Sequence, residues 1–229
     1  MWVHYKMKME IGNFMEKKKR KLVIIGCGGI GILLCRCIHK LSRFKKYIKI
    51  LVDADIVEIK NLKRQWFHPE DIGRHKVQIA KSLFDEKDDV HIIPEMWEGK
   101  ETLGKFEFST TKTAISEKDI IIICTDNNIV AAKIAIEYRK RCHLLRPANE
   151  HYYAGLTYIS PLVSGANLNT LCKTWRIKPD DDGEPCEDDE QSTAANLLAV
   201  SMCLQKLKEI DLDADMCEPT KVFRQLEIL

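Results

Sequence analysis

Residues Leu22–Gly31 read LVIIGCGGIG and indicate the fold class most clearly. The first four residues form an unbroken apolar run, which is typical of a strand buried on both faces of a parallel sheet. Gly26, Gly28 and Gly31 follow the GxGxxG spacing, and Gly29 lies between them. Such glycines permit a tight turn and a close approach of the backbone to a phosphate at the start of a helix. The stretch therefore predicts a strand, a glycine turn and a helix.

The rest of the chain continues this alternation of strands and helices. We expect helices over Ile30–Leu41, Asp71–Leu83, Ile129–Lys140 and Ser192–Ile210. We expect further strands over Ile48–Val52, Val90–Ile93, Ile120–Cys124, Cys142–Leu145 and Tyr153–Ile159. This order predicts an α/β fold with a Rossmann-like, doubly wound and mostly parallel sheet.

The 229 residues suit one continuous domain. Residues 1–21 form a basic leader, and residues 22–150 form the nucleotide-binding half. Residues 151–229 add an extended carboxy-terminal part that faces the substrate. This part contains the carboxylate-rich stretch Asp180–Glu190, which we expect to be a crossing loop, and the late helix.

The composition excludes several classes of protein. Lysine and arginine number 36 against 34 aspartates and glutamates, so the bulk charge predicts no nucleic-acid partner. No apolar run approaches the roughly 20 residues of a membrane helix, and the basic start has no secretory signal pattern. Nine cysteines without a CxxC pair indicate a reducing cytoplasm and mostly buried thiols, and they make zinc an unexpected cofactor.

Polar residues follow the expected strands at the positions where ligands bind in open α/β sheets. Asp53 follows the strand Ile48–Val52 and fits an acid that binds ribose hydroxyls. Further along come Asp55, the cluster of Asn61, Arg64 and Gln65, then Lys76, Asp126 and Asn127. Carboxylates for ribose and for a metal, together with cations for phosphates, are what the chemistry of a nucleoside triphosphate requires.

The glycine motif and Asp53 alone would favour an NAD-dependent oxidoreductase. Asn61, Arg64 and Gln65 argue against that class, because a dehydrogenase has no need for such a cluster beyond the acidic strand end. An NAD-dependent oxidoreductase is therefore the alternative that the glycine motif and Asp53 support.

The ordered motifs resemble those of the ThiF-type adenylyltransferase superfamily, the activating enzymes of ubiquitin-like and sulfur-carrier proteins. The resemblance covers Leu22 to about Glu150 and rests on the glycine loop and three further segments: Asp53–Gln65, Asp71–Lys76 and Cys124–Asn127. It implies adenylation of the carboxyl terminus of a small β-grasp protein by ATP with Mg²⁺, with release of pyrophosphate. It also implies a homodimer.

The resemblance implies a role for each matching residue. Asp53 would bind the ribose, and the loop Gly26–Gly31 would lie along the phosphates. Asn61, Arg64 and Gln65 would face the triphosphate, with Lys76 as a further cation. Asp126 would bind Mg²⁺ carried by ATP, and Asp55 and Asn127 would support the site.

The chain also departs from the family pattern. The leader offers only Arg20 where relatives carry an arginine-bearing helix that completes the partner's site, and the two CxxC pairs of zinc-binding relatives are missing. These departures keep open a non-catalytic or heterodimeric scaffold that binds a ubiquitin-like partner.

Cys186 is the candidate for a covalent thioester or persulfide step. It lies in the crossing loop where some relatives carry such a cysteine. Its neighbours Glu184, Glu187 and Asp188 are acidic, which raises the pKa of a thiol and opposes this role. A basic partner would relieve that opposition.

Overall fold

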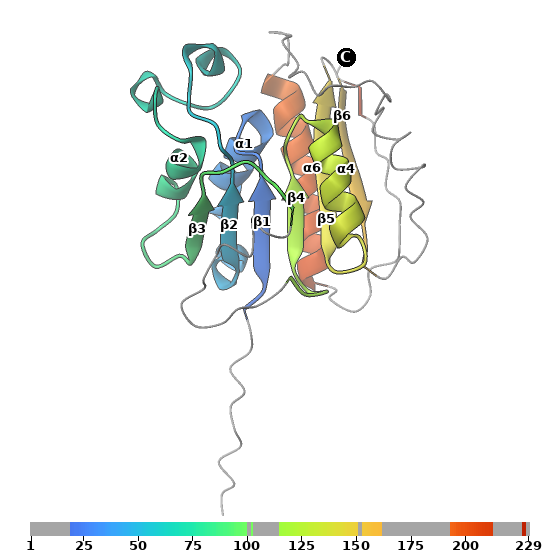
Figure 1. Ribbon diagram of the computed structural model, residues 1–229. Coiled ribbons are helices and arrows are strands. Elements are labelled where there is room, and N and C mark those ends of the chain that lie inside the picture. The colour runs from blue at the N-terminus through green and yellow to red at the C-terminus, as the bar shows by residue number, and fades with distance from the viewer. Residues whose placement is uncertain are drawn as a thin grey trace, which may run out of the picture.

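The computed structural model describes residues 19–99, 102, 115–150, 153–161, 193–212 and 226–227. Seven strands form one sheet in the order β3-β2-β1-β4-β5-β6-β7 (Figure 1). They are β1 (Lys21–Ile25), β2 (Ile48–Val52), β3 (Val90–Ile93), β4 (Ile120–Ile123), β5 (His143–Glu150), β6 (Tyr153–Ile159) and β7 (Leu226–Glu227). Strands β1 to β5 pair in parallel, whereas β6 and β7 are antiparallel to their neighbours. The expected mostly parallel, Rossmann-like sheet is confirmed.

The strand order reverses beside β1. The chain runs from β1 outward to β2 and β3, and then returns to place β4 on the other side of β1. A reversal of this kind opens a crevice at the carboxyl ends of the two central strands, where open α/β sheets bind ligands. We therefore expect the ligand-binding site at the carboxyl ends of β1 and β4.

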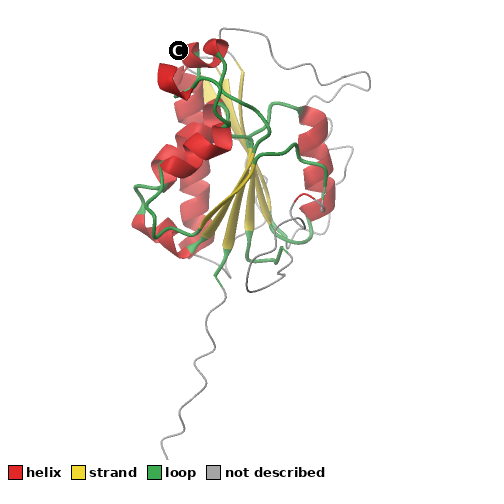
Figure 2. Ribbon diagram, turned by 60° about the vertical axis from the view of Figure 1, so that its left-hand side comes forward, coloured by secondary structure: helices red, strands yellow, loops and turns green. Residues whose placement is uncertain are grey.

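Helices cover both faces of the sheet (Figure 2). The helices α1 (Gly29–Ile38), α2 (Lys76–Ser82) and α6 (Thr193–Leu212) contribute to one hydrophobic cluster, and α4 (Asn128–Tyr138) contributes to the other. Successive strand residues alternate between the clusters, as Ile24 and Ile25 of β1 show. Burial on both faces explains why these strands are continuously apolar.

One expected helix was wrong in its extent. The segment Asp71–Leu83 was expected to be helical throughout, but α2 begins only at Lys76. Gly73 has a φ of +82°, and Asp71 ends the short 3₁₀ helix η3 (Pro69–Asp71). Asp71 Oδ2 accepts a hydrogen bond from His68 N (3.0 Å), which closes a turn in place of a helical start.

Strand β5 is longer than its apolar run predicted. We expected a strand over Cys142–Leu145, but β5 continues to Glu150. Strand β4 pairs only with His143–Leu145, so Pro147 lies beyond the end of β4, where a missing N–H on that side removes no ladder bond. The extension carries β5 past β4 at the ligand-binding edge.

Buried ion pairs lie at the opposite, amino-terminal edge. Lys21 was placed in the leader, but it is the first residue of β1 and only 1% exposed. Its backbone N–H donates to Asp119 Oδ1 (2.7 Å), and its ammonium lies 3.5 Å from Asp119 Oδ2. Lys49 and Asp88 form a second buried pair at 2.9 Å. Each buried charge thus has a partner, as burial requires.

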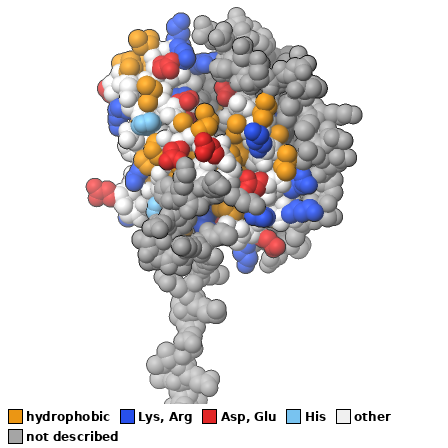
Figure 3. Space-filling view, viewed as in Figure 1, with side chains coloured by type: hydrophobic (Ala, Val, Ile, Leu, Met, Phe, Trp, Pro, Cys, Tyr) orange, Lys and Arg blue, Asp and Glu red, His pale blue; other side chains and the backbone are white. Residues whose placement is uncertain are grey.

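Several expectations fall outside the described residues. They are the leader up to residue 18, most of the connection Glu98–Ser116, the acidic stretch Asp180–Glu190 and Cys186. Among the helices that are described, none is both long and apolar enough to cross a membrane. The described surface in Figure 3 shows acidic, basic and apolar side chains interspersed.

Candidate functional site

The glycine loop crosses directly over the end of β4. Gly26 has a φ of +93°, and a Cβ atom placed on it would lie 2.8 Å from the carbonyl carbon of Cys124 and from Thr125 N. A Cβ on Gly31 would lie 2.0 Å from Gly26 O. Only glycine fits at these two positions, because any side chain would collide with backbone. The loop is therefore fixed at the point where the strand order reverses.

Helix α1 presents its amino end at this loop. Its first backbone hydrogen bond runs from Ile32 N to Gly28 O (2.9 Å). The N–H groups of the preceding turn have no intrahelical acceptor, and they carry the positive end of the helix dipole. This is the geometry that binds phosphate groups in nucleotide-binding folds.

Asp53 lies across the loop from β2. Its Oδ2 accepts a hydrogen bond from Cys27 N (2.5 Å), and its Oδ1 accepts one from Asp55 N (2.8 Å). Burial raises the pKa of this carboxyl, and the two backbone donors and Lys76 oppose that rise. The side chain is thus held rigidly beside the glycine loop, where a ribose acid is expected.

Lys76 and Asp55 form an ion pair below the same edge. Lys76 Nζ lies 2.8 Å from Asp55 Oδ2, and Lys76 N donates to Asp55 O (2.9 Å). The lysine side chain is 7% exposed and the aspartate side chain is 60% exposed. Asp55 therefore holds a buried cation near Asp53. The predicted supporting role of Asp55 thus has a physical form.

Asn61 organises the loop that carries Arg64 and Gln65. It is buried in the 3₁₀ helix η2 (Ile59–Lys63), and its Oδ1 accepts a hydrogen bond from Glu58 N (2.9 Å). Gln65 N donates to Asn61 O (2.8 Å). The carboxamide of Gln65 lies 3.8 Å from the position of a Cβ on Gly28. The loop thus brings Gln65 to the glycine loop, with the half-buried Arg64 next to it.

The end of β4 adds Asp126 and Asn127. Asp126 is exposed, whereas Asn127 caps α4 by accepting a hydrogen bond from Val130 N (3.0 Å). Asn127 therefore has a structural role, and its contact with a nucleotide stays a prediction. Asp126 lies on the β4 side of the crevice, opposite Asp53 and Lys76.

The sequence reasoning missed Arg146. This residue of β5 is 8% exposed and donates a hydrogen bond to Asn128 Oδ1. Burial lowers the pKa of Arg146 to about 10, and the negative charge of Asp126 opposes that fall. Arg146 and Asp126 therefore attract each other across this edge of the sheet. An arginine followed by proline gave no signal for this, because the strand was expected to end at Leu145.

Comparison with known proteins agrees with this geometry. The model of the ThiF family matches residues 11–216. The chain belongs to the ThiF family. Its match to ubiquitin-like modifier-activating enzyme 5 of Arabidopsis thaliana is 26% identical over 146 residues, 59% of this chain and 32% of that protein. Its match to the adenylyltransferase and sulfurtransferase UBA4 of Debaryomyces hansenii is 33% identical over 115 residues, 49% and 23% of the two chains.

A solved structure shows the same fold. MccB of E. coli with ATP superposes with a TM-score of 0.61 at 18% identity, over 92% of this chain and 64% of that chain. The ThiF-family chain thus spans about a third or less of the curated relatives' length and less than two thirds of MccB.

Burial affects every described cysteine of this ThiF-family chain. They are Cys27, Cys35, Cys37, Cys124, Cys142 and Cys203, all unpaired. Burial raises the pKa of each, as for Cys35, where it reaches about 12. Thiols of this kind are poor nucleophiles at neutral pH. Cys172, Cys186 and Cys217 lie outside the described residues.

Asp126 is the residue that the sequence predicts to bind Mg²⁺ carried by ATP. Within the described ranges, no three His, Cys, Asp or Glu side chains form a group that could hold a metal ion. Mg²⁺ in nucleotide sites is typically held by one or two carboxylates together with the phosphates. The exposed carboxylate of Asp126 fits that arrangement.

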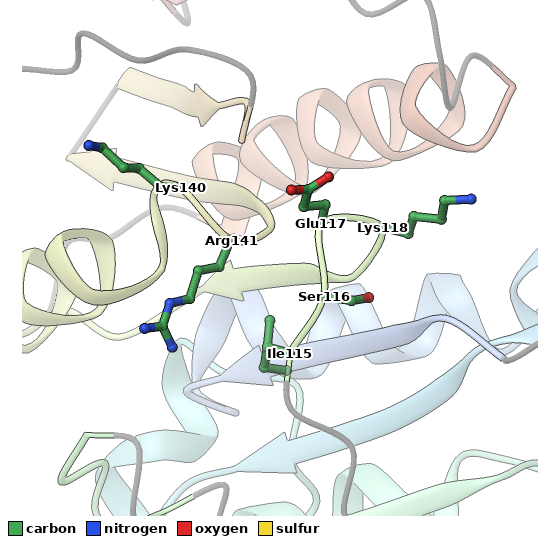
Figure 4. A pocket seen from close by; sticks show the side chains of 6 residues that line it. All are labelled: Ile115, Ser116, Glu117, Lys118, Lys140 and Arg141. Carbon is green, nitrogen blue, oxygen red and sulfur yellow. The ribbon is translucent and has the colours of Figure 1, made fainter.

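A shallow pocket lies at the other edge of the sheet (Figure 4). It is lined by Ile115, Ser116, Glu117, Lys118, Lys140 and Arg141. These residues precede β4 and β5, whereas ligands of open α/β sheets bind beyond the carboxyl ends. The pocket is therefore separate from the glycine-loop site.

Proposed function

We propose that this ThiF-family chain adenylates the carboxyl terminus of a small ubiquitin-like or sulfur-carrier protein, or of a related peptide, at the expense of ATP. The observation that supports this most is the fixed glycine loop with Asp53 bound to it and the Lys76–Asp55 pair beside it. A dehydrogenase needs the first two features but has no use for a buried cation held there. Family membership also favours adenylation over the NAD-dependent alternative.

The chemistry that this geometry supports is a displacement at the α-phosphorus. A carboxylate oxygen forms a bond to the α-phosphorus while the bond to the bridging oxygen of pyrophosphate breaks, and pyrophosphate leaves with both bonding electrons. The carboxylate is already ionised at neutral pH, so no general base is required. The protein then contributes position and charge neutralisation.

Each part of the site has one task in this proposal. Asp53 binds the ribose hydroxyls, and the amino end of α1 holds phosphoryl oxygens. Lys76 and Arg64 neutralise charge that develops on the leaving pyrophosphate. Mg²⁺, when bound through Asp126, adds charge neutralisation at the phosphates. Arg146, 8% exposed in β5, attracts the carboxylate of Asp126 by its positive charge.

Three finer points belong to the same proposal. A protein or peptide substrate is supported by the similarity to UBA4 and to the modifier-activating enzymes and by the structure of MccB with AMPCPP and MccA. A second copy of the chain forms a homodimer, as the family resemblance implies. Any later thioester or persulfide step uses Cys186.

The test is exchange of labelled pyrophosphate into ATP, dependent on a carrier protein that ends in glycine or on a peptide with a free carboxyl terminus. Asp126→Asn keeps the shape of the side chain and removes its charge, so the exchange rate should fall by about 100-fold. Asp85→Asn is the matched control, because Asp85 pairs with Lys45 on the exposed surface far from the loop. Its rate should equal that of the wild type.

One result would count against adenylation, and a second would change only the role of Asp126. If no carboxyl-terminal substrate supports pyrophosphate exchange and the protein does not bind ATP, the scaffold alternative is favoured. Exchange that is equal in wild type and Asp126→Asn would remove Asp126 from the site while leaving the activity in place.

A further inference from the structure

Two carboxamide side chains flank the glycine loop from opposite sides. Gln65 reaches Gly28 from the loop after β2. Asn196 reaches Gly29 from the first turns of α6, with its Nδ2 atom 3.1 Å from the position of a Cβ on Gly29. Gln65 belongs to the motif that the family resemblance already covers. Asn196 lies far along the chain, and no motif pointed to it.

Asn196 is buried and its orientation is fixed. The residue is 1% exposed, and its Oδ1 accepts a hydrogen bond from Asn149 Nδ2 (2.9 Å) at the far end of β5. With Oδ1 engaged by Asn149, Nδ2 faces the glycine loop. That Nδ2 has no hydrogen-bond acceptor within the part of the chain that the structure describes. A buried donor without an acceptor costs free energy and is rare in folded proteins.

The surroundings of Asn196 Nδ2 indicate which kind of acceptor it would bind. The N–H groups of the first turn of α1 lie there, and they are donors too. The helix dipole makes the same place electropositive. A ligand group that accepts several hydrogen bonds and carries negative charge would satisfy all of these donors together. Anionic oxygen, on a phosphoryl group or a carboxylate, is the chemistry that fits.

We propose that Asn196 is an anion-binding residue of the glycine-loop site, which donates from Nδ2 to a phosphoryl oxygen of the nucleotide, and that Asn149 is the residue that positions it. The inference rests on the proposed function, since the nucleotide is its ligand. It extends that function by adding β5 and α6 to a site otherwise built from β1, β2 and β4.

The test compares ligands that differ in the number of phosphates. ATP with Mg²⁺, AMP and adenosine are titrated into the full chain by calorimetry. Asn196→Leu keeps the size of the side chain and removes the donor, so ATP and AMP should bind about tenfold or more weakly while adenosine binds as in the wild type. Asn196→Asp should weaken the phosphate ligands further by repulsion. Gln205→Leu, an exposed amide on the same helix, is the matched control and should change none of the three.

Thermal unfolding without ligand separates binding from structure. Asn196→Leu removes a buried donor that has no acceptor, but it also removes the acceptor of Asn149 Nδ2. Because these two effects oppose each other, the ligand-free unfolding temperature should stay close to that of the wild type. A fall in that temperature, with equal losses of ATP and adenosine affinity, would overturn the inference. So would unchanged affinity for all three ligands.

Asn149→Leu tests the positioning role. Its effect on ATP affinity should be large in the wild type and should vanish in the Asn196→Leu background, because Asn149 acts through Asn196. Effects that simply add would overturn that role.

A last arm distinguishes the source of the anionic oxygen. If nucleotide affinities stay unchanged but the KM for the carboxyl-terminal substrate rises in Asn196→Leu, the donor serves the carboxylate and the assignment to phosphate is wrong. Wild-type protein that binds no ATP at all would refute the proposed function itself, independently of Asn196.

Discussion

Gly26 is constrained from two directions at once. Its φ of +93° is strained for any residue with a side chain, and the backbone of Cys124 and Thr125 occupies the space where a Cβ would lie. Since backbone cannot move aside as a flexible side chain does, β1 and β4 would have to separate to accept alanine. The same contact that prohibits a side chain places the loop against the crevice.

We therefore predict that Gly26→Ala lowers the free energy of unfolding by at least about 2 kcal/mol. Gly155→Ala in β6 is the control, because a Cβ there meets no heavy atom within 4 Å. It should be neutral or slightly stabilising. Urea unfolding followed by circular dichroism measures both. Equal midpoints for the two variants would show that the loop relaxes at little cost.

Lys76 is predicted to act through its charge. Lys76→Met keeps the length and the apolar stem of a side chain that is 7% exposed, but it leaves Asp55 without its cation. We expect the rate of pyrophosphate exchange to fall by about 100-fold while the fold is retained. Lys45→Met, in an exposed ion pair with Asp85, should exchange at the wild-type rate. A Lys76→Met protein with full activity would exclude this cation from the reaction.

Among the helices and strands, the sequence predicts best those whose structure is determined by neighbouring residues in the chain. The apolar run of β1 and the spacing of the glycines after it both belong to one short stretch, so the strand, the glycine loop and the position of Asp53 after β2 could be predicted. The delayed start of α2 depends on the turn at Asp71, which competes with a helical start. The helical spacing of the residues after Lys76 led us to expect a helix from Asp71 onward.

The missed site residues depend on contacts between distant elements. Arg146 and Asn149 enter the site only because β5 extends past β4, and this extension is stabilised by pairing with β6. Asn196 reaches the glycine loop only because α6 packs against α1. Neither arrangement leaves a pattern in the local sequence. The family motifs locate one side of the crevice, and tertiary packing supplies the other.

The β5–β6 pair contains a buried histidine with a predictable pH effect. His143 Nδ1 lies 2.9 Å from the hydroxyl of Tyr158, and the two rings are stacked. Burial, aided by the charge of Arg20, lowers the pKa of His143 to about 4. An unfolded histidine has a pKa of about 6.5, so the unfolded chain binds more protons between these values. Stability due to neutral His143 is thus present above about pH 6.5 and is lost as pH falls toward 4.

We predict that His143→Gln reduces the loss of unfolding free energy between pH 7 and pH 4.5 by about 2–3 kcal/mol. Glutamine retains a polar group for Tyr158 and does not titrate. Urea unfolding of both proteins across this pH range measures the change in unfolding free energy of each. The contributions of other titrating groups cancel when the two changes are subtracted. Parallel pH profiles for the two proteins would contradict a buried neutral histidine. His68→Gln, at an exposed position, serves as the control.

Across the whole molecule, the proposed nucleotide site combines residues from several strand ends and from a helix that are far apart in the sequence. The glycine loop follows β1, Asp53 follows β2, and Asp126 follows β4. Asn196 lies on α6, where Asn149 of β5 positions it. A ligand that binds these elements together binds only the folded chain. Its binding free energy is then added to the free energy of unfolding.

ATP with Mg²⁺ at 100 times its Kd should therefore stabilise the protein by about 2.7 kcal/mol. For a chain of this size, that corresponds to a rise in unfolding temperature of roughly 5–10 °C. Differential scanning fluorimetry measures the shift, and Lys76→Met and Asn196→Asp should reduce it. NAD at the same concentration should produce little shift, because it lacks the triphosphate that Lys76 and α1 are placed to bind. A large shift with NAD and none with ATP would reverse the assignment of this site to adenylation, since the glycine loop and Asp53 alone would then account for the ligand.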